Sequence, residues 1–210
     1  MTSFQVVEIF ESIQGESSFS GLPCAFIRFA GCNLDCGWCD TPQAKKSAGL
    51  QIDISAILCK IKQTGLKYVC LTGGEPLLQR DIGRLMQRLL DEEIVVSIET
   101  NGSLDWTWIP DDIHCCIDIK CPSSGMHNSF RMDCLKRLRA KDEIKFVIAD
   151  HDDYEYAKNI FLNNLVNFDI PVFASPVHKE LDPSLLARWI LSDKIPFRIH
   201  LQIHKILGIK

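Results

Sequence analysis

The sequence lacks a long apolar run, a low-complexity tract and an internal repeat. Its first residues, 1–5, also lack a basic segment followed by an apolar one. These absences predict neither a membrane span nor a secretory signal, and we expect a cytoplasmic protein. No linker composition divides the 210 residues, so we expect a single domain over 1–210.

An excess of basic residues is missing as well. Lysine and arginine number 23 against 27 aspartates and glutamates, which gives a formal net charge of −4. A broad nucleic-acid footprint needs a concentrated positive surface, and here the basic residues are scattered. The 46% hydrophobic content is ordinary for a globular protein. We therefore expect a small-molecule partner, with no nucleic acid and no membrane.

A second Cys-x2-Cys pair is also absent. Ten cysteines occur, and three of them form a Cys-x3-Cys-x2-Cys motif at Cys32, Cys36 and Cys39. Thiolates grouped in this way select zinc or an iron–sulfur cluster. A closed zinc site and an electron-transfer four-iron cluster each need four protein ligands. We favour a [4Fe–4S] cluster held by three thiolates, which leaves one iron free to bind a reactant.

Other interpretations of these cysteines stay open. They are a zinc site with a remote histidine or cysteine, buried thiols without a ligand, and a disulfide with one free thiol. Disulfides are not favoured, because the chain is neither small nor evidently exported. A second cluster on Cys115, Cys116 and Cys121 is not favoured, since adjacent strand residues point to opposite faces. We expect the remaining four to be small core residues: Cys24, Cys59, Cys70 and Cys134.

Strand-sized apolar segments alternate with helical segments. Strands are predicted at 4–9, 24–29, 68–71, 94–99, 113–120, 143–148, 170–174 and 197–203, and helices at 54–64, 82–90, 129–139, 152–165 and from 183 onward. Asp53 and Asp182 are the expected caps of two helices. Such alternation is typical of right-handed βαβ units with parallel strands. Because a complete barrel takes about 250 residues, we expect an α/β fold, a partial, open TIM-like barrel of about six βα units. A doubly wound sheet is the second choice.

Several polar segments lie at or just after the predicted strand ends. They are the cysteine loop, 72–74, 99–102 and 118–120. Ligands of parallel α/β folds bind at this edge, so we expect these segments to meet there. Gly73 and Gly74 would let backbone atoms approach a ligand, although a plain tight turn is the alternative. Arg28 could fork two donors onto a carboxylate, and a surface salt bridge is its alternative.

The cysteine motif and the segment Gly73-Gly74-Glu75-Pro76 together resemble the radical S-adenosylmethionine (SAM) superfamily. A narrower resemblance, to the 7-carboxy-7-deazaguanine synthase family, rests on segments 10–16, 26–28, 31–41, 71–76, 98–102 and 202–210. That family converts 6-carboxy-5,6,7,8-tetrahydropterin to 7-carboxy-7-deazaguanine with loss of ammonia, for queuosine-type tRNA bases. The resemblance implies a [4Fe–4S] cluster, SAM, Mg²⁺, a homodimer, and a reductase or flavodoxin-type electron donor.

The resemblance also implies roles for individual residues. The pterin would contact Ile13, Gln14, Gly15, Glu16, Arg28, Thr72, His204 and Lys210. SAM would contact Trp38, Cys39, Asp40, Gly74 and the segment Asp118, Ile119 and Lys120. The hydroxyl of Thr41 would bind Mg²⁺, a hard ion that prefers oxygen ligands.

Two departures from the family pattern stand out. The family often has Ser-Pro-Lys where this chain has Asp118-Ile119-Lys120, and commonly has glycine where this chain has Ser17. Two rival functions remain at this point. One is a glycyl-radical activating enzyme with the same cluster and a protein substrate, and the other is an iron–sulfur or zinc module without catalysis.

Overall fold

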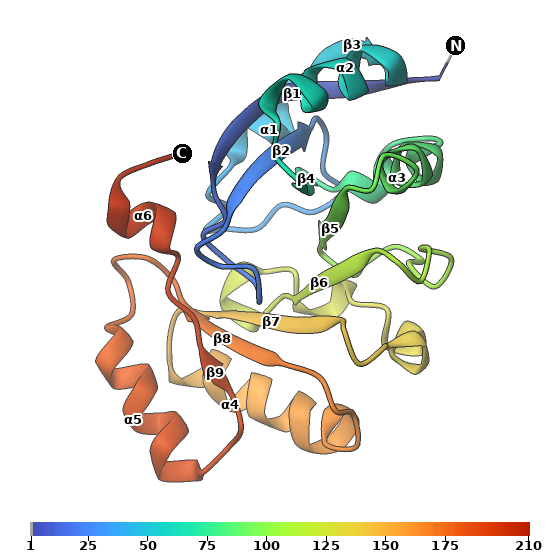
Figure 1. The fold of residues 1–210 in the computed structure, drawn as a ribbon. Helices are drawn as coiled ribbons and strands as arrows, with labels where there is room; N and C mark the ends of the chain where they lie inside the picture. Colours follow the sequence, from blue (N-terminus) through green and yellow to red (C-terminus); the bar gives the residue numbers. More distant parts are fainter. Residues whose placement is uncertain (1) are drawn as a thin grey trace.

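One nine-stranded sheet runs through residues 2–210, which are the residues that the computed structural model describes. The strand order is β3-β1-β2-β4-β5-β6-β7-β8-β9. The strands are β1 (Ser3–Ile13), β2 (Pro23–Phe29), β3 (Leu50–Asp53), β4 (Tyr68–Gly73), β5 (Val95–Thr100), β6 (His114–Ile119), β7 (Glu143–Ile148), β8 (Val172–Pro176) and β9 (Arg198–Ile199). Figure 1 shows that the sheet curves without closing, so the predicted open, partial barrel is confirmed.

In the order of the sheet, each strand pairs in parallel with the next along the run β2-β4-β5-β6-β7-β8-β9. The prediction of parallel strands is wrong for β1, which pairs antiparallel with β2 and also with β3, a strand that was not predicted. A parallel pair needs a crossover of about a dozen residues or more. The loop 14–22 between β1 and β2 is too short for one, so these strands form a hairpin. All nine strands share one sheet.

The helices are α1 (Pro42–Lys46), α2 (Ile54–Thr64), α3 (Ile82–Leu90), α4 (His151–Ile160), α5 (Pro183–Asp193) and α6 (Ile203–Leu207). Helices α3, α4 and α5 lie outside the curve of the sheet, and α6 stands apart from them near the C-terminus (Figure 1). Both predicted caps are confirmed, since Asp53 accepts from the Ala56 amide at 3.0 Å and Asp182 accepts from the Ser184 amide at 2.8 Å. No helix in the described part of the chain has the length and apolar character that crossing a bilayer requires.

Two predicted elements are wrong. The segment 129–139 forms short 3-10 turns, His127–Ser129 and Met132–Arg137, in place of an α-helix. Tertiary contacts override its helical pattern, because the Arg131 amide donates to the Gly102 carbonyl at 2.9 Å and Arg139 binds two distant carbonyls. The predicted strand 197–203 pairs only at Arg198–Ile199, and α6 begins at Ile203.

Two layers of side chains flank the sheet. The outer layer is one apolar core, in which alternate strand residues pack with the helices, among them Ile27, Leu71, Ile98, Ile117 and Ile144. Burying each of these side chains stabilises the fold by about 1.5–3 kcal/mol. The inner layer has a smaller apolar cluster of Cys24, Phe26, Tyr68 and Cys70.

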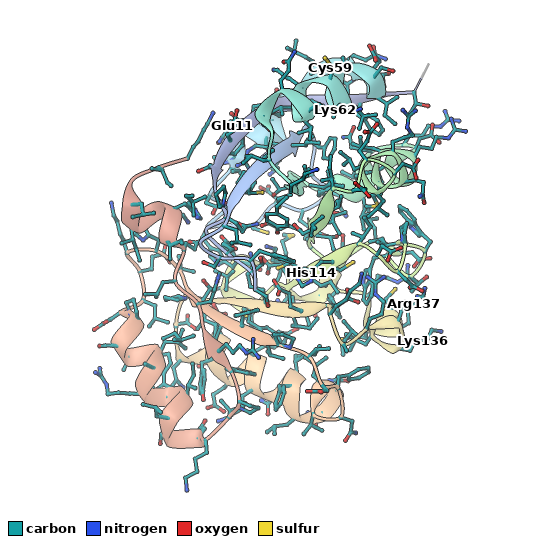
Figure 2. All side chains as sticks on the ribbon, viewed as in Figure 1. Glu11, Cys59, Lys62, His114, Lys136 and Arg137 are labelled. Atoms are coloured by element: carbon teal, nitrogen blue, oxygen red, sulfur yellow. The ribbon has the colours of Figure 1, made fainter. Side chains whose placement is uncertain are left out.

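The loop 14–22 covers the end of the curved sheet at which the parallel strands β4 and β6 begin. Its Phe19 stacks on Tyr68 at 4.5 Å between ring centroids and meets His114 edge-on at 4.8 Å. Tyr68 and His114 are the first residues of β4 and β6, and Figure 2 shows His114 inside the sheet. The opposite, carboxyl end is therefore the end through which a ligand can enter.

The cysteines outside the motif are buried with one exception. The prediction that Cys59 is a core residue is wrong, because its thiol is exposed on α2 beside Lys62 (Figure 2). The helix turns Ile57, Leu58 and Ile61 inward, and Cys59 lies on the opposite side. Cys24, Cys70 and Cys134 are buried as predicted.

Candidate active site

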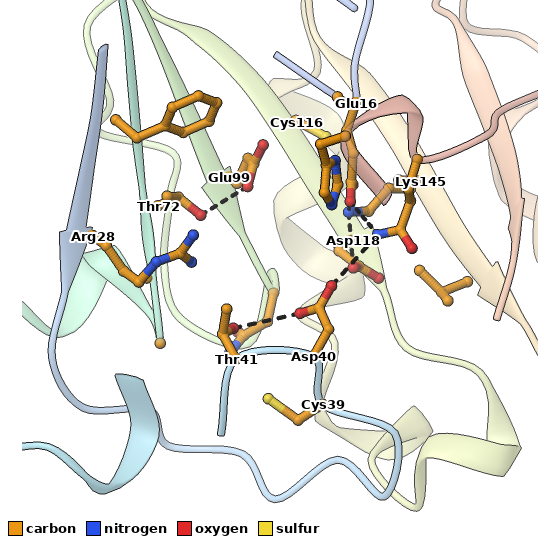
Figure 3. Close-up of a pocket in the computed structure, with 18 of the residues that line it drawn as sticks. Glu16, Arg28, Cys39, Asp40, Thr41, Thr72, Glu99, Cys116, Asp118 and Lys145 are labelled. Carbon is orange, nitrogen blue, oxygen red and sulfur yellow. Dashed lines mark hydrogen bonds and ion pairs between the residues drawn. The ribbon is translucent and has the colours of Figure 1, made fainter. Parts of the chain in front are cut away.

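A cavity of about 390 Å³ opens at the carboxyl ends of the parallel strands. Its walls come from the loop after β1, the cysteine loop, the ends of β2, β4, β5, β6 and β7, and the C-terminal segment (Figure 3). Of the predicted site residues, the following line it: Ile13, Gln14, Gly15, Glu16, Arg28, Cys32, Cys36, Trp38, Cys39, Asp40, Thr41, Thr72, Gly74, Asp118, Lys120, His204 and Lys210. The exception is Ile119, whose side chain is buried in the outer core, so that only its backbone could touch a ligand there.

The three motif cysteines are half-buried free thiols at the cavity wall. Burial raises the pKa of Cys32 and of Cys36. The Asn101 side-chain amide lies 3.9 Å from the Cys32 sulfur, at the distance of a weak N–H···S contact. Within residues 2–210 no three His, Cys, Asp or Glu side chains converge tightly enough for a single metal ion. The three thiols line the same cavity, and thiolates are the ligands that an iron–sulfur cluster takes.

Gly73 and Gly74 are required because two loops touch. A Cβ on Gly74 would lie 1.9 Å from the Gly31 carbonyl oxygen, and a Cβ on Gly73 would lie 2.4 Å from the Phe29 carbonyl oxygen. Gly73 also has a φ of 150°, which side chains rarely adopt. The glycine turn is therefore more than a plain tight turn, since it packs its backbone directly against the cysteine loop.

Glu75 joins the turns that follow β4 and β5. Its carboxylate is fully buried and accepts from the Leu77 amide at 3.0 Å, the Asn101 amide at 2.8 Å and the Thr100 hydroxyl at 2.8 Å. These hydrogen bonds lower the pKa of Glu75, but burial outweighs them and the pKa is raised. Glu75 thus fixes Asn101, which the sequence analysis did not assign, beside Cys32 and Asn33.

A second carboxyl group, that of Glu99, faces the cavity from β5. It accepts from the Thr72 hydroxyl at 2.8 Å and from the Gln14 amide at 3.4 Å. Burial raises its pKa, and the negative charge of Glu16 raises it further. Sequence reasoning placed Glu99 at a strand end without assigning it to the site. The alternation of Ile98 and Glu99 was the available signal.

Arg28 is held by an acidic partner on the neighbouring strand. Its Nε lies 3.0 Å from Glu8, which also pairs with the ammonium of Lys210. The guanidinium and that ammonium both stack over Phe10, at 5.5 and 5.0 Å from the ring centroid. Arg28 therefore forms the salt bridge that was its alternative role, and it also lines the cavity.

The C-terminal segment packs on the loop after β1. The Ile203 amide donates to the Gly15 carbonyl at 3.2 Å, and a Cβ on Gly15 would lie 1.8 Å from the His204 ring nitrogen Nδ1. Glycine at 15 is thus what lets His204 reach the cavity. Burial lowers the pKa of His204, which favours the neutral imidazole. At the end of the segment, the Ser12 hydroxyl donates to the Lys210 backbone oxygen at 2.5 Å.

Asp40 ties the cysteine loop to this segment. Its carboxylate lies 3.1 Å from Lys205 and 3.5 Å from the Gln202 amide, and it accepts from the Thr41 hydroxyl at 3.4 Å. Burial raises the pKa of Asp40 and so does Glu16, but Lys205 and Lys145 outweigh them and the pKa is lowered. Gln202 and Lys205 were not predicted, and no local pattern marks them.

A line of alternating charges crosses the floor of the cavity. Lys145 lies 3.4 Å from Asp118 and 2.5 Å from Glu16 (Figure 3). Lys120 lies 2.9 Å from Asp118, and Gln202 donates to the other Glu16 oxygen. Lys120 also stacks over Trp38, with its ammonium 5.2 Å from the ring centroid. Lys145 was missed by the sequence analysis, because one lysine in an apolar strand carries no motif.

Comparisons with known proteins agree with this geometry. Residues 26–114 match the model of the Radical SAM superfamily. The chain is 40% identical over 209 residues to the 7-carboxy-7-deazaguanine synthase of Methanospirillum hungatei, covering 99% of this chain and 87% of that protein. It is 41% identical to the synthase of Koribacter versatilis, covering 97% and 96% of the two chains.

A solved structure shares the fold. The crystal structure of QueE from Escherichia coli superimposes with a TM-score of 0.77 at 22% identity, covering 95% of this chain and 93% of that one. This likeness shows the open-barrel architecture, and the sequence relatives show the family. The chain belongs to the 7-carboxy-7-deazaguanine synthase family of the radical SAM superfamily.

Proposed function

We propose that this chain converts 6-carboxy-5,6,7,8-tetrahydropterin to 7-carboxy-7-deazaguanine with release of ammonia, a step toward queuosine-type bases. The synthase activity is that of the family to which the chain belongs. The observation that carries the proposal is that the cysteine motif, the Gly73-Gly74 turn and the polar residues of the loop after β1 line one cavity. Membership in this family decides against a glycyl-radical activating enzyme and against a module without catalysis.

Cys32, Cys36 and Cys39 would hold the [4Fe–4S] cluster that a radical SAM enzyme implies. When bound, the cluster and SAM supply one-electron chemistry that removes a hydrogen atom from the substrate. The protein positions the substrate and keeps water out. Because Gly74 and Gly31 have no side chains, the backbone of the glycine turn packs directly against the backbone of the cysteine loop.

SAM would lie between the cysteine loop and the end of β6. Trp38, Asp40 and Lys120 offer an aromatic face and two charges to this part of the cavity. A solved structure of similar fold, anSMEcpe with bound AdoMet, superimposes on this chain with a TM-score of 0.56 at 17% identity. Asp118 offers a carboxylate, and the Ile119 contribution is limited to its backbone.

The pterin would lie on the other side, over Thr72 and the loop after β1. Gln14 and Glu16 offer a side-chain amide and a carboxylate to the ring, and the backbones of Ile13 and Gly15 line the same wall. Arg28 would pair with the substrate carboxylate, which Glu8 now mimics at 3.0 Å. His204 and Lys210 complete this wall.

A magnesium ion would bind the Thr41 hydroxyl, and substrate oxygens and water would complete its shell. The support is that Thr41 lines the cavity directly after Asp40 and is held by it at 3.4 Å. We also propose a homodimer, which is supported by exposed apolar side chains on and after α6: Ile206, Leu207 and Ile209.

A cytoplasmic location and a reductase or flavodoxin-type electron donor belong to the same proposal. They are supported by the chemistry of the thiols, because all ten cysteines are free in the structure. Free thiols are the norm in a reducing compartment. A cluster that must be reduced to become active also needs a low-potential donor there.

One anaerobic assay tests the proposed function. The reconstituted protein is incubated with reductant, SAM and the carboxytetrahydropterin, with and without Mg²⁺. We expect the mass of 7-carboxy-7-deazaguanine and an equal amount of ammonia, with a higher rate when Mg²⁺ is present. Absence of this product from a protein that contains about four irons would refute the substrate assignment.

A further inference from the structure

We propose that Lys145 is a positioning residue of the reaction: its ammonium holds the Glu16 carboxylate toward the pterin. This inference rests on the proposed function, since it takes Glu16 as a group that binds the substrate. Lys145 comes from the middle of β7, and neither its sequence context nor the family resemblance assigns it a role.

The geometry gives Lys145 one main partner. Its ammonium lies 2.5 Å from Glu16 and 3.4 Å from Asp118, and Asp118 already has Lys120 at 2.9 Å. Lys145 and Glu16 are both buried in the chain. A close, buried ion pair of this kind fixes the direction of both side chains.

The other Glu16 oxygen is also engaged. Gln202 donates to it from the C-terminal segment, and the Glu16 amide donates to the Gln14 side chain at 3.1 Å. Each carboxylate oxygen has two lone pairs, so both keep acceptor capacity for a ring N–H. Glu16 is therefore clamped in place while it can still accept hydrogen bonds from a substrate.

The ionised state of Glu16 depends on Lys145 because of the charges that surround the two residues. Asp40 on the cysteine loop and Glu99 on β5 place negative charge near Glu16. Asp118 on β6 shares the ammonium of Lys145, which is the close cation of Glu16. His200 and His204 face it from the C-terminal segment, and burial lowers the pKa of both imidazoles. Burial alone would raise the pKa of Glu16, but the charge and hydrogen bond of Lys145 hold it well below its usual range.

Removal of Lys145 should therefore change the protonation of Glu16. In Lys145→Met, burial and the surrounding carboxylates raise the Glu16 pKa, so that this group is protonated in weak acid and ionised only at higher pH. A protonated carboxyl offers a weaker acceptor to a ring N–H. Pterin affinity in the variant should thus fall as the pH falls, while Glu16 in the parent stays ionised throughout.

The test is calorimetric titration of the cluster-loaded protein with the carboxytetrahydropterin. SAM is present and reductant is absent, so that binding is measured without turnover. At about pH 6 we expect Lys145→Met to raise the Kd by about 30-fold or more, and the difference should shrink toward about pH 8.5. The matched control is Lys158→Met, which removes an ammonium that pairs with Glu155 and Asp193 at the surface. It should leave the affinity unchanged.

A double-mutant cycle provides a second test if Lys145→Met folds poorly. Glu16→Gln and Glu16→Gln/Lys145→Met leave no uncompensated Glu16 charge. If Lys145 acts through Glu16, the two should bind the pterin equally and show no extra pH dependence. Additive losses, or a loss in Lys145→Met that is equal at every pH, would overturn the inference. Failure of the parent protein itself to bind the pterin would instead refute the proposed function.

Discussion

Along β2, β4, β5, β6 and β7, the residue that packs against the outer core is isoleucine or leucine, and the next residue, which faces the cavity, is polar or charged. The pairs are Ile27 and Arg28, Leu71 and Thr72, Ile98 and Glu99, Ile117 and Asp118, and Ile144 and Lys145. The outer face gains free energy from burial without needing specific partners. The inner face must match each buried charge with a partner. Stability and function are thus assigned to alternate residues of the same strands.

The largest effect that separates the two faces is expected at Cys36. Cys36→Ala removes one of three thiolates at the cavity wall, so cluster binding and turnover should both be lost. Iron analysis and the product assay measure this. The control is Cys134→Ala, at a cysteine buried in the outer core, which should keep its iron. Deazaguanine formation by Cys36→Ala would contradict the mechanism.

The next effect is on stability. Leu71→Ala empties a site in the outer core where the side chain is fully buried, and it should lower the free energy of unfolding by about 2–5 kcal/mol. Urea denaturation measures the loss. Its neighbour Thr72→Val changes the inner face and should cost about 0.5–1.5 kcal/mol, while weakening pterin binding. Equal stability losses at 71 and 72 would show that the division between faces is wrong.

A smaller effect is expected from the end of the chain, where Lys210 contacts Glu8 and Ser12 on β1. Deleting residues 209–210 removes the Lys210 contacts with Glu8 and Ser12. The KM for the pterin should rise by about tenfold, which corresponds to about 1.4 kcal/mol, with little change in the urea midpoint. Lys210→Ala keeps the backbone at this position and should have the milder effect. Unchanged KM in the deletion would exclude Lys210 from the site.

The smallest effect is a pH dependence at the cavity edge. Burial raises the pKa of Glu8, but hydrogen bonds from Lys210 and Arg28 outweigh it and lower the pKa below 4.5. Because the folded-state pKa is depressed, the stabilisation is present above pH 4.5 and is lost as the pH falls through the folded value. Glu8→Gln should therefore be less stable than the parent by about 1 kcal/mol or less near neutral pH, and equal to it in strong acid. Urea midpoints across this range measure the difference, and a constant gap would contradict it.

Local patterns predicted much of the fold. Asp53 and Asp182 were recognisable as caps because the capping hydrogen bond lies within three residues of the cap. The open barrel followed from the alternation of strands and helices. The antiparallel pairing of β1 escaped prediction, although the length of the loop 14–22 held the signal. The 3-10 structure in place of the helix 129–139 could not be predicted, because it depends on contacts of Arg137 and Arg139 with the distant carbonyls of Thr107, Pro110 and Ile113.

The site divides in the same way. The sequence singled out Cys32, Cys36, Cys39 and Gly74 because a cluster site requires those residue types at close spacing, and all four line the cavity. Lys145, Gln202 and Lys205 were not, because each acts on a residue more than 120 positions away. Ile119 was assigned from its position in a motif, whereas the alternation of the strand turns its side chain into the outer core.

By itself the sequence determined which chemistry is available, because ligand type, helix caps and glycine turns depend on residues that are neighbours in the chain. Only the tertiary structure decided which carboxylate meets which ammonium on the cavity floor. Those pairs join β6, β7, the loop after β1 and the C-terminal segment. The physical reason is that a buried charge is stabilised by whatever opposite charge the fold brings within a few ångströms, however far away it lies in the sequence.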